Sequence, residues 1–370
     1  MIAPDGSKSP LIAALTLFAA MAGTLTLTLG NGLLPAGTLW AAFCGLTAYK
    51  VLRSGRFSFW RPLYFSVMAL CFILYFKFLH PQVDGSDIAS AVQPPSCHIA
   101  LASSALNYAN AVLIALSKGT LGVWGPLVAG ILWLAATLAL GQAWCSWACF
   151  YGGIDDGLSR VLPRRWQILR FYAPEKVKHI QSALLLAFLL AGLGTMTPFF
   201  CHWLCPVKLT YFSDALTGAG RFQLIAVWVL GLAALAVGPL LTGRRTFCGL
   251  ICPFGAWQAF FGRINPFRVT AADTACGGCG ACKDSCPVFA ISKDADSKTR
   301  ISSYCNRCGN CVDACPNNRL RYTMLGAEVP ARLGFSARTL FVWVCLYIGG
   351  LMGSLYIPAL LRELCSRLIS

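Results

Sequence analysis

Two stretches of this chain share one spacing of cysteines: CGGCGACKDSCP at residues 276–287 and CNRCGNCVDACP at residues 305–316. In each stretch three cysteines follow one another at intervals of three residues, and a fourth comes four residues later with a proline directly after it. A compact loop of this kind aims several soft thiolates inward at once, and the proline turns the chain away. The spacing therefore indicates that both stretches bind [4Fe-4S] clusters.

The two stretches together form the signature of bacterial two-cluster ferredoxins, in which three cysteines of one run and the fourth of the other run share a cluster. The predicted ligands are Cys276, Cys279, Cys282 and Cys315 for cluster 1, and Cys305, Cys308, Cys311 and Cys286 for cluster 2. A pair of structural zinc sites is the alternative, because zinc also favours CxxC pairs. Zinc, however, requires neither the three-plus-one pattern nor the proline after both fourth cysteines.

The rest of the chain is far more apolar. Of the 370 residues, 57% are hydrophobic and 12% are charged, and the mean hydropathy is +0.64. This composition excludes a soluble enzyme, a disordered chain and a small disulfide scaffold. We predict an all-α polytopic membrane bundle of seven transmembrane helices, with a small α+β two-[4Fe-4S] ferredoxin-like domain inserted before the last helix.

The predicted spans cover residues 11–29, 33–51, 62–79, 121–140, 182–200, 222–241 and 339–360. A weaker segment at residues 99–116 is interpreted as interfacial or re-entrant. The predicted regions are 1–120 (N-terminal membrane helices and an outward loop), 121–264 (membrane core with three CxxxC(P) motifs), 265–325 (the two-cluster domain) and 326–370 (C-terminal transmembrane helix and tail). The two-cluster domain is too small to bury a large core, so bound metal is expected to hold it together.

The charged residues are 30 Lys and Arg against 14 Asp and Glu, a net charge of +16. In an apolar chain this excess indicates basic cytoplasmic loops rather than a nucleic-acid groove. Lys and Arg collect after the second, fourth and sixth predicted spans, whereas residues 81–97 contain none. The expected location is a bacterial cytoplasmic (inner) membrane, with the two-cluster domain in the cytoplasm, contacts with lipid and none with nucleic acid.

Three further cysteine pairs follow predicted spans: Cys145 and Cys149 in WCSWACFYGG, Cys201 and Cys205 in FCHWLCPVKL, and Cys248 and Cys252 in FCGLICPFGA. If the helix continues, the spacing places both sulfurs of a pair on one face. The pairs form an imperfect repeat of about 50 residues. The first and third pairs could converge on a further metal centre, or each pair could cycle between dithiol and disulfide as a redox site. Asp155 and Asp156 are expected to cap the helix after the first pair.

From Gly141 to Tyr322 the chain resembles the NapH/MauN type of membrane ferredoxin and, more broadly, the NosR/NirI group of polyferredoxin-like membrane proteins. The resemblance rests on CSWAC before an Arg-rich loop, on FCGLICPFGA and on the double cluster motif, in that order. It implies a four-helix core with CxxxCP motifs on the cytoplasmic side, two [4Fe-4S] clusters, and electron transfer tied to the quinone pool or to a periplasmic reductase system. The chain departs from the family pattern at Phe150, where proline is expected, in the extra pair Cys201/Cys205, and in its added N- and C-terminal spans.

Two functions use these parts. The first is a membrane-bound iron-sulfur electron-transfer protein, the electron-transfer component of an oxidoreductase system such as a quinol dehydrogenase. It passes electrons between cytoplasmic clusters and the quinone pool or an extracytoplasmic redox partner subunit, and the basic domain surface could dock an acidic donor such as a ferredoxin or flavodoxin. The alternative is an accessory or maturation factor that supplies reducing equivalents for assembly of an extracytoplasmic metalloenzyme.

Overall fold

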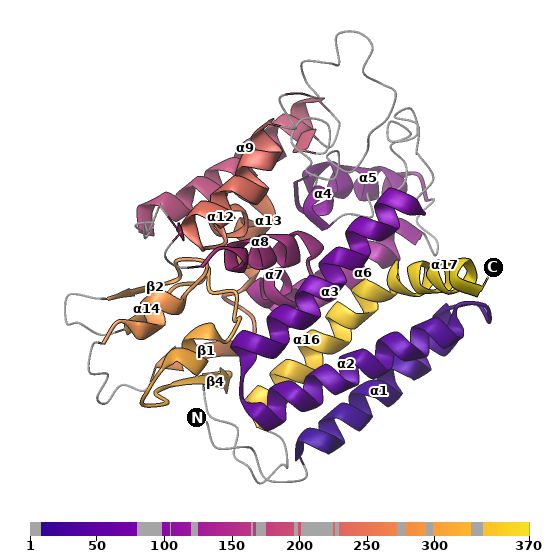
Figure 1. Ribbon diagram of the computed structural model, residues 1–370. Helices are drawn as coiled ribbons and strands as arrows, with labels where there is room; N and C mark the ends of the chain where they lie inside the picture. Colours follow the sequence, from indigo (N-terminus) through magenta and orange to yellow (C-terminus); the bar gives the residue numbers. More distant parts are fainter. Residues whose placement is uncertain are drawn as a thin grey trace.

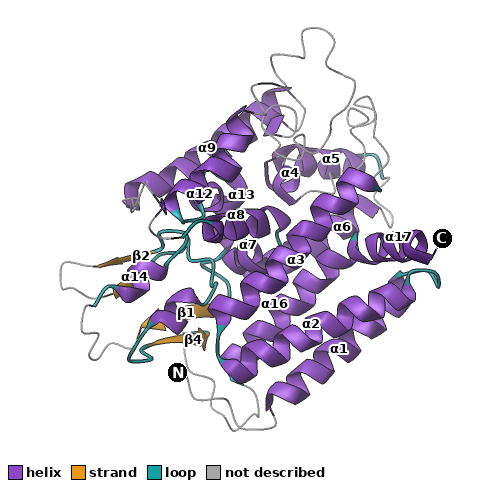
Figure 2. Cartoon of the chain, viewed as in Figure 1, coloured by secondary structure: helices purple, strands orange, loops and turns teal. Residues whose placement is uncertain are grey.

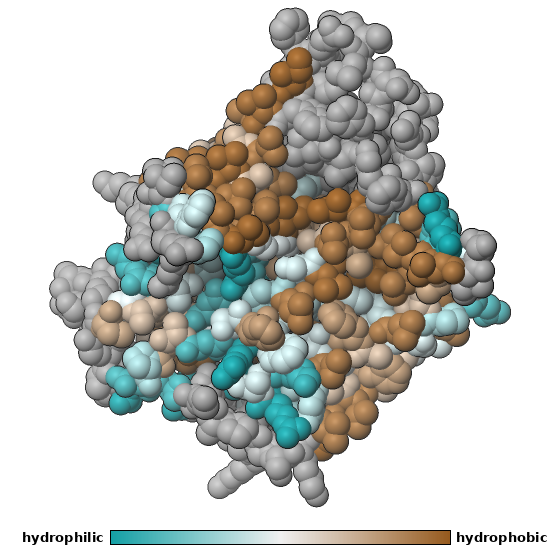
Figure 3. Space-filling view, in the orientation of Figure 1, coloured by the Kyte–Doolittle hydropathy of each residue, from teal (hydrophilic) through white to brown (hydrophobic). Residues whose placement is uncertain are grey.

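The computed structural model describes residues 9–79, 98–103, 105–119, 125–163, 166–167, 175–195, 199–200, 225, 229–271, 279–293, 299–326 and 336–369. Within these ranges the chain is mostly helical, and its strands belong to a small lobe at one end of the helices (Figure 1; Figure 2). Hydrophobic side chains cover much of the helical surface in Figure 3, and hydrophilic ones gather over the lobe and its boundary with the helices. This distribution fits a membrane protein.

Four long helices lie side by side: α1 (Ser9–Thr28), α2 (Leu34–Ser54), α3 (Phe57–Phe78) and α16 (Ala337–Ser354) (Figure 1). Helix α1 shows how they pack. It buries Leu17, Met21 and Leu25, which recur every four residues and therefore share one face, and it exposes Leu15 and Leu27. A helix that is apolar on its exposed face as well is suited to lipid rather than water.

The second group of helices is shorter and surrounds the cysteine pairs. Its elements are α4 (His98–Ser103), α5 (Ala105–Ser117), α6 (Gly125–Leu140), η1 (Gly141–Ala143), α7 (Trp144–Trp147), α8 (Phe150–Val161), η3 (Glu175–Lys178), α9 (His179–Thr195), η5 (Ala233–Val237), α12 (Gly238–Thr242), η6 (Phe247–Ile251) and α13 (Pro253–Phe261). Helix α8 packs against α3, and α13 packs against α9, so this group joins the long helices on one side.

Among the described residues, four helical stretches are long and apolar enough to cross a membrane: Pro10–Thr28, Phe57–Tyr75, Gly130–Val161 and Ala337–Ser354. The membrane class is thus supported, whereas the count of seven spans stays a prediction. Helix α5, in the weaker predicted segment, has 13 residues, too few to cross a hydrocarbon core of about 30 Å.

The last predicted span, residues 339–360, is wrong at its C-terminal end. Helix α16 ends at Ser354, and a separate helix α17 (Ile357–Ile369) follows. Proline has no backbone N–H and its ring clashes with the carbonyl four residues earlier, so Pro358 prevents α16 from continuing past Ser354.

The lobe has the predicted α+β composition: β1 (Phe267–Ala271), α14 (Ala281–Ser285), β2 (Ile291–Lys293), β3 (Thr299–Ile301), α15 (Asn310–Ala314) and β4 (Leu320–Met324). Its first and last strands pair antiparallel, with Phe267 opposite Met324 and Ala271 opposite Leu320. Strands β2 and β3 form a second antiparallel pair between the two short helices. This closure places the two cysteine runs inside one small unit.

Side chains on both sides hold the lobe against the helices. Arg307, between two predicted cluster ligands, donates hydrogen bonds to the carbonyls of Leu140 (3.1 Å) and Gly262 (3.2 Å). The Asp313 carboxylate accepts a 2.7 Å bond from the backbone N–H of Ser58, at the start of α3. The lobe is therefore docked on the helices by hydrogen bonds to and from backbone groups, which suits a fixed arrangement.

Gly280 and Gly309 occupy the same position in the two cysteine runs and offer a matched test of this docking. Both have a left-handed backbone, with φ of 77° and 82°, where a side chain costs about 1–2 kcal/mol. A Cβ at Gly280 would meet nothing within 4 Å, whereas one at Gly309 would lie 2.6 Å from the ring of Phe57 on α3.

We expect Gly280→Ala to lower the free energy of unfolding by about 1–2 kcal/mol, the cost of the left-handed backbone. Gly309→Ala should lower it by the same amount and by about 1–3 kcal/mol more, because its methyl group overpacks against Phe57. Thermal unfolding of the detergent-solubilised protein measures both. Equal losses in the two variants would show that Phe57 does not support the lobe at Gly309.

Candidate metal centre and the buried cysteine pairs

From Gly280 and from Gly309 onward, the two cysteine runs of the lobe fold alike. Each short helix, α14 and α15, begins after a left-handed glycine and ends at the fourth cysteine of its run. The backbone angles of these cysteines are nearly equal, φ −76° and ψ 113° at Cys286, and φ −78° and ψ 111° at Cys315. The N–H of Ala290 donates to Cys286 Sγ (3.2 Å), and that of Arg319 donates to Cys315 Sγ (3.3 Å). Such donors favour thiolate over neutral thiol, as metal binding requires.

We call Cys286, Cys305, Cys308 and Cys311 the inner set. The structure brings these thiols together although Cys286 belongs to the first run. Burial raises the pKa of Cys311, and the nearby thiols of Cys305, Cys308 and Cys286 raise it further. Burial and the thiol of Cys286 likewise raise the pKa of Cys305 to about 12. Buried, converging thiols such as Cys286, Cys305 and Cys311, whose pKa values are raised, become thiolates only when a cation compensates them, so this set fits a metal group.

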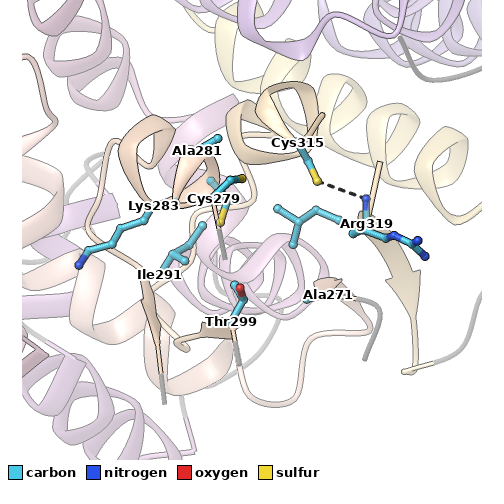
Figure 4. A pocket seen from close by; sticks show the side chains of 11 residues that line it. Ala271, Cys279, Ala281, Lys283, Ile291, Thr299, Cys315 and Arg319 are labelled. Carbon is cyan, nitrogen blue, oxygen red and sulfur yellow. Dashed lines mark hydrogen bonds between the residues drawn. The ribbon is translucent and has the colours of Figure 1, made fainter. Parts of the chain in front are cut away.

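We call Cys276, Cys279, Cys282 and Cys315 the outer set. Cys276 lies outside the described residues. The other three line one pocket together with apolar and basic side chains, and Figure 4 shows Cys279 and Cys315 reaching into it from different elements. Cys279 is exposed, and Cys282 and Cys315 are half-buried. The outer set therefore lies nearer the surface than the inner set, in which Cys286, Cys308 and Cys311 are buried.

Two basic residues near the inner set were not singled out from the sequence. Lys178, in η3, is buried and lowers the pKa of Cys286 by its positive charge, against the larger effect of burial. Arg307 is buried beside Cys305, whose charge it also stabilises. In the sequence Lys178 is one of several loop cations, and nothing local marks it as buried. Positive charge of this kind favours the reduced, more negative state of an iron-sulfur cluster.

The structure describes two of the three CxxxC pairs. Cys145, Cys149, Cys248 and Cys252 are all buried and not in disulfides, whereas Cys201 and Cys205 lie outside the described residues. The helix does not continue through either pair. Cys149 and Cys252 have extended backbones and start the next helices, α8 and α13. At Cys252 the cause is Pro253, because a residue before proline avoids the helical conformation.

A buried ion pair joins the first pair to the third. The Arg245 guanidinium donates to the carbonyl of Cys145 and to the hydroxyl of Ser146 (3.0 Å), and its Nε lies 4.0 Å from Asp155 Oδ2. The same carboxylate oxygen accepts a 2.9 Å bond from the N–H of Cys248. Burial and the charge of Asp155 raise the pKa of the Cys248 thiol, while Arg245 opposes this rise. Arg245 and Asp155 thus hold the two motifs together.

The capping role expected of Asp155 and Asp156 is wrong. Both residues lie in the middle of α8, whose N-terminal cap is Cys149. Asp156 is buried and binds two arginines, with 3.0 Å from Oδ1 to Arg61 Nη2 and 3.0 Å from Oδ2 to Arg160 Nε. Arg61 is fully buried. Two adjacent acids in an otherwise apolar stretch were the sequence signal for buried partners, because a carboxylate there must be paired.

No three His, Cys, Asp or Glu side chains of the described residues are close enough together to hold a single metal ion. This holds for the inner set as well as for the four described CxxxC cysteines. A group of several irons and sulfides spreads its thiolate ligands more widely than one tetrahedral zinc ion does.

Comparison with protein families finds two matches. A 4Fe-4S dicluster domain matches residues 268–316, which hold all eight lobe cysteines, from Cys276 to Cys315. A 4Fe-4S binding domain matches residues 121–168, 180–211 and 224–269, and each of these segments contains one CxxxC pair. The comparison with solved structures finds no match.

Several known proteins are similar to part of the chain. The ferredoxin-type protein NapH of Escherichia coli is 29% identical over 170 residues, 45% of this chain and 54% of NapH. The methylamine utilization ferredoxin-type protein MauN of Paracoccus denitrificans is 30% identical over 164 residues, 44% of this chain and 53% of MauN. MauN of Methylobacillus flagellatus is 46% identical over 57 residues. The chain spans about half the length of the first two relatives. Over this part it is a homologue of the NapH and MauN ferredoxin-type proteins, and its cofactors are [4Fe-4S] clusters.

Proposed function

We propose that this chain is a membrane-bound iron-sulfur electron-transfer protein. Its inner and outer cysteine sets hold one [4Fe-4S] cluster each, and the six cysteines of the CxxxC pairs supply further redox or metal sites. Electrons pass between the lobe and the quinone pool or an extracytoplasmic redox partner. When bound, the clusters supply one-electron carriers; the chain supplies thiolates, amide donors and a docked lobe.

One observation carries this proposal: Cys286, from the first run, lies among Cys305, Cys308 and Cys311 of the second. Two independent sites, one per run, would keep Cys286 with its own run. The interlocked arrangement supports a shared two-cluster unit, in which the carriers are close neighbours. Close carriers in a lobe docked on membrane helices are what electron transfer at a membrane surface requires.

The proposed orientation places the lobe in the cytoplasm of a bacterial inner membrane. The α2–α3 connection, with Arg53 and Arg56, lies at the lobe end of the helices (Figure 1). Arg160 and Arg244 line a cavity against the lobe. Basic connections resist translocation and stay in the cytoplasm. Because the lobe lies at the same end of the helices as these connections, this placement supports a cytoplasmic lobe.

The same cavity supports a quinone as electron acceptor or donor. It has a volume of about 320 Å³ and lies between the start of α3, the end of α8 and the lobe. Arg160 and Arg244 offer donors to quinone carbonyls, and Asp313 offers an acceptor for a quinol hydroxyl. Cys286 of the inner set lines it as well, so a head group bound there would sit beside a cluster ligand.

A soluble donor is the proposed partner at the outer set. Lys283 and Arg319 line the pocket of Cys279, and Arg300 and Arg321 are exposed on neighbouring strands. An acidic donor such as a ferredoxin or flavodoxin fits this charge. The maturation function uses the same parts and differs in its acceptor, a metalloenzyme under assembly.

The test uses the full-length protein purified from membranes without oxygen. We expect about eight irons per chain from the two lobe clusters, more if the CxxxC cysteines bind iron, and paramagnetic signals on reduction. Addition of a short-chain quinone should reoxidise the reduced clusters. Zinc in place of iron would overturn the proposal. If quinone fails to oxidise the reduced clusters, the quinone pool is not the acceptor, and the proposed acceptor becomes an extracytoplasmic redox partner. A deletion strain with intact quinone-linked respiration and a metal-free partner enzyme would select the maturation function.

A further inference from the structure

We propose that Cys145, Cys149, Cys248 and Cys252 form one site for a third iron-sulfur centre, adjacent to the inner set. The inference rests on the proposed function, because a third carrier is useful only beside an occupied lobe. It selects one of the two chemistries left open for these pairs: a shared metal centre instead of two separate dithiols.

The first support is local geometry. Cys149 (φ −85°, ψ 117°) and Cys252 (φ −64°, ψ 118°) have nearly the backbone of the lobe ligands Cys286 and Cys315. Each of the four follows a short helical segment and comes four residues after another cysteine. In both membrane motifs the N–H of the second cysteine bonds the carbonyl just before the first, at 3.0 Å and 2.9 Å. The membrane pairs therefore share with the ends of the lobe runs the extended backbone of the last cysteine, whereas their hydrogen bond differs, because the N–H of Cys286 bonds the carbonyl of Lys283 (3.2 Å).

The second support is the joining of the two pairs. The thiol of Cys248 interacts electrostatically with those of Cys252 and Cys145, and Cys145 interacts with Cys149. All four cysteines are at most 9% exposed. Arg245 and Asp155 bind the backbone of one motif each, which fixes the two pairs relative to each other. Independent dithiols would need no such connection between the motifs.

The third support is charge. Cys149 and Cys252 stand at the N-termini of α8 and α13, helices of 12 and 9 residues, where the helix dipole favours thiolate. The buried guanidinium of Arg245 adds a positive charge at the first cysteine of each pair. A buried set of thiolates with their iron carries net negative charge, which the helix N-termini and Arg245 offset, while the carboxylate of Asp155 acts against them at Cys248.

The site also touches the inner set. The N–H of Arg245 donates a 2.9 Å bond to the carbonyl of Pro287, directly after Cys286. Gly249, within the third motif, faces Val288 and Phe289 closely enough that an added Cβ would lie 3.5 Å from Val288 Cα. The turn that carries Cys248 therefore rests on the loop that carries an inner ligand. A centre in this position would extend the lobe clusters into the membrane helices.

The test counts iron and paramagnetic centres in the full-length protein purified without oxygen. We expect about twelve irons per chain, four beyond the lobe clusters, and a loss of about four in Cys145→Ser and in Cys248→Ser with the lobe signals retained. Cys44→Ser, a buried cysteine of α2 remote from these motifs in sequence, should keep all the iron.

The iron count of the wild-type protein tests the third centre even if the serine variants fold poorly. It compares the total iron with the number of spins from the lobe clusters in the same sample. About eight irons in the wild type, or unchanged iron in both serine variants, would overturn the third centre and leave the lobe clusters standing. Absence of the lobe signals themselves would instead overturn the proposed function.

Discussion

Replacing Cys308 by serine should remove one of the two lobe clusters and loosen the lobe from the helices. Cys308 is buried in the inner set, and its neighbour Gly309 packs on Phe57 of α3. Loss of the inner group leaves buried thiols without their cation at the surface where the lobe docks. We expect about four irons fewer per chain, loss of one paramagnetic signal, and faster proteolysis of the lobe.

Cys282→Ser is the matched variant in the outer set. Cys282 is half-buried and lines the pocket of Cys279. The Cys282→Ser variant should also lose about four irons, but it should lose the paramagnetic signal of the outer cluster and keep that of the inner one. Its lobe should stay docked, because Asp313 and Gly309, which contact α3, lie on the side of the inner set. Paramagnetic resonance with spin counting measures the signals, and limited proteolysis measures docking.

The fourth cysteines test the interlocked pairing itself. If ligands cross between runs, Cys315→Ser should reproduce the spectrum of Cys282→Ser, and Cys286→Ser that of Cys308→Ser. If each run instead holds its own cluster, Cys315→Ser should reproduce the spectrum of Cys308→Ser, and Cys286→Ser that of Cys282→Ser. The second result would contradict the placement of Cys286 among the inner thiols.

The lobe could be predicted from the sequence because its information is local. Cysteine spacing fixes the type of turn, and the same turn occurs twice with nearly equal backbone angles at Cys286 and Cys315. A small domain held by metal needs few long-range contacts to be specified. The antiparallel pairing of β1 with β4 then follows from closing the chain around the two runs.

The membrane core could be predicted only in outline, because its decisive contacts join residues far apart in the chain. Arg61 and Arg245 are ordinary loop cations in the sequence, and only the fold shows them buried against Asp156 and Asp155. The helix breaks before Cys149 although no proline lies there, so the sequence does not predict this break. A charge is buried when a partner from another helix meets it, and spacing along one helix carries no information about that partner.

Replacing Arg61 by methionine should lower the free energy of unfolding by about 3–5 kcal/mol, because it leaves the buried Asp156 with one partner fewer. Arg61 is fully buried, lies 3.0 Å from Asp156 Oδ1 and also donates to the carbonyl of Ser146 (3.2 Å). Arg160 remains, but it is partly exposed and binds only the other carboxylate oxygen. Equilibrium unfolding in mixed micelles measures the loss.

The double variant Arg61→Met with Asp156→Leu separates charge from packing. Removing both charges should restore most of the stability, since a buried ion pair replaced by apolar side chains of similar volume is often neutral or better. Arg367→Met is the exposed control: its pair with Glu363 spans one turn of α17 and is worth less than about 0.5 kcal/mol. If Arg61→Met costs no more than this control, Asp156 is not held as a buried anion, and the ion pair cannot be what fixes α3 against α8. If the double variant is as unstable as the single one, the arginine acts by filling space, and α3 and α8 are held together by packing alone.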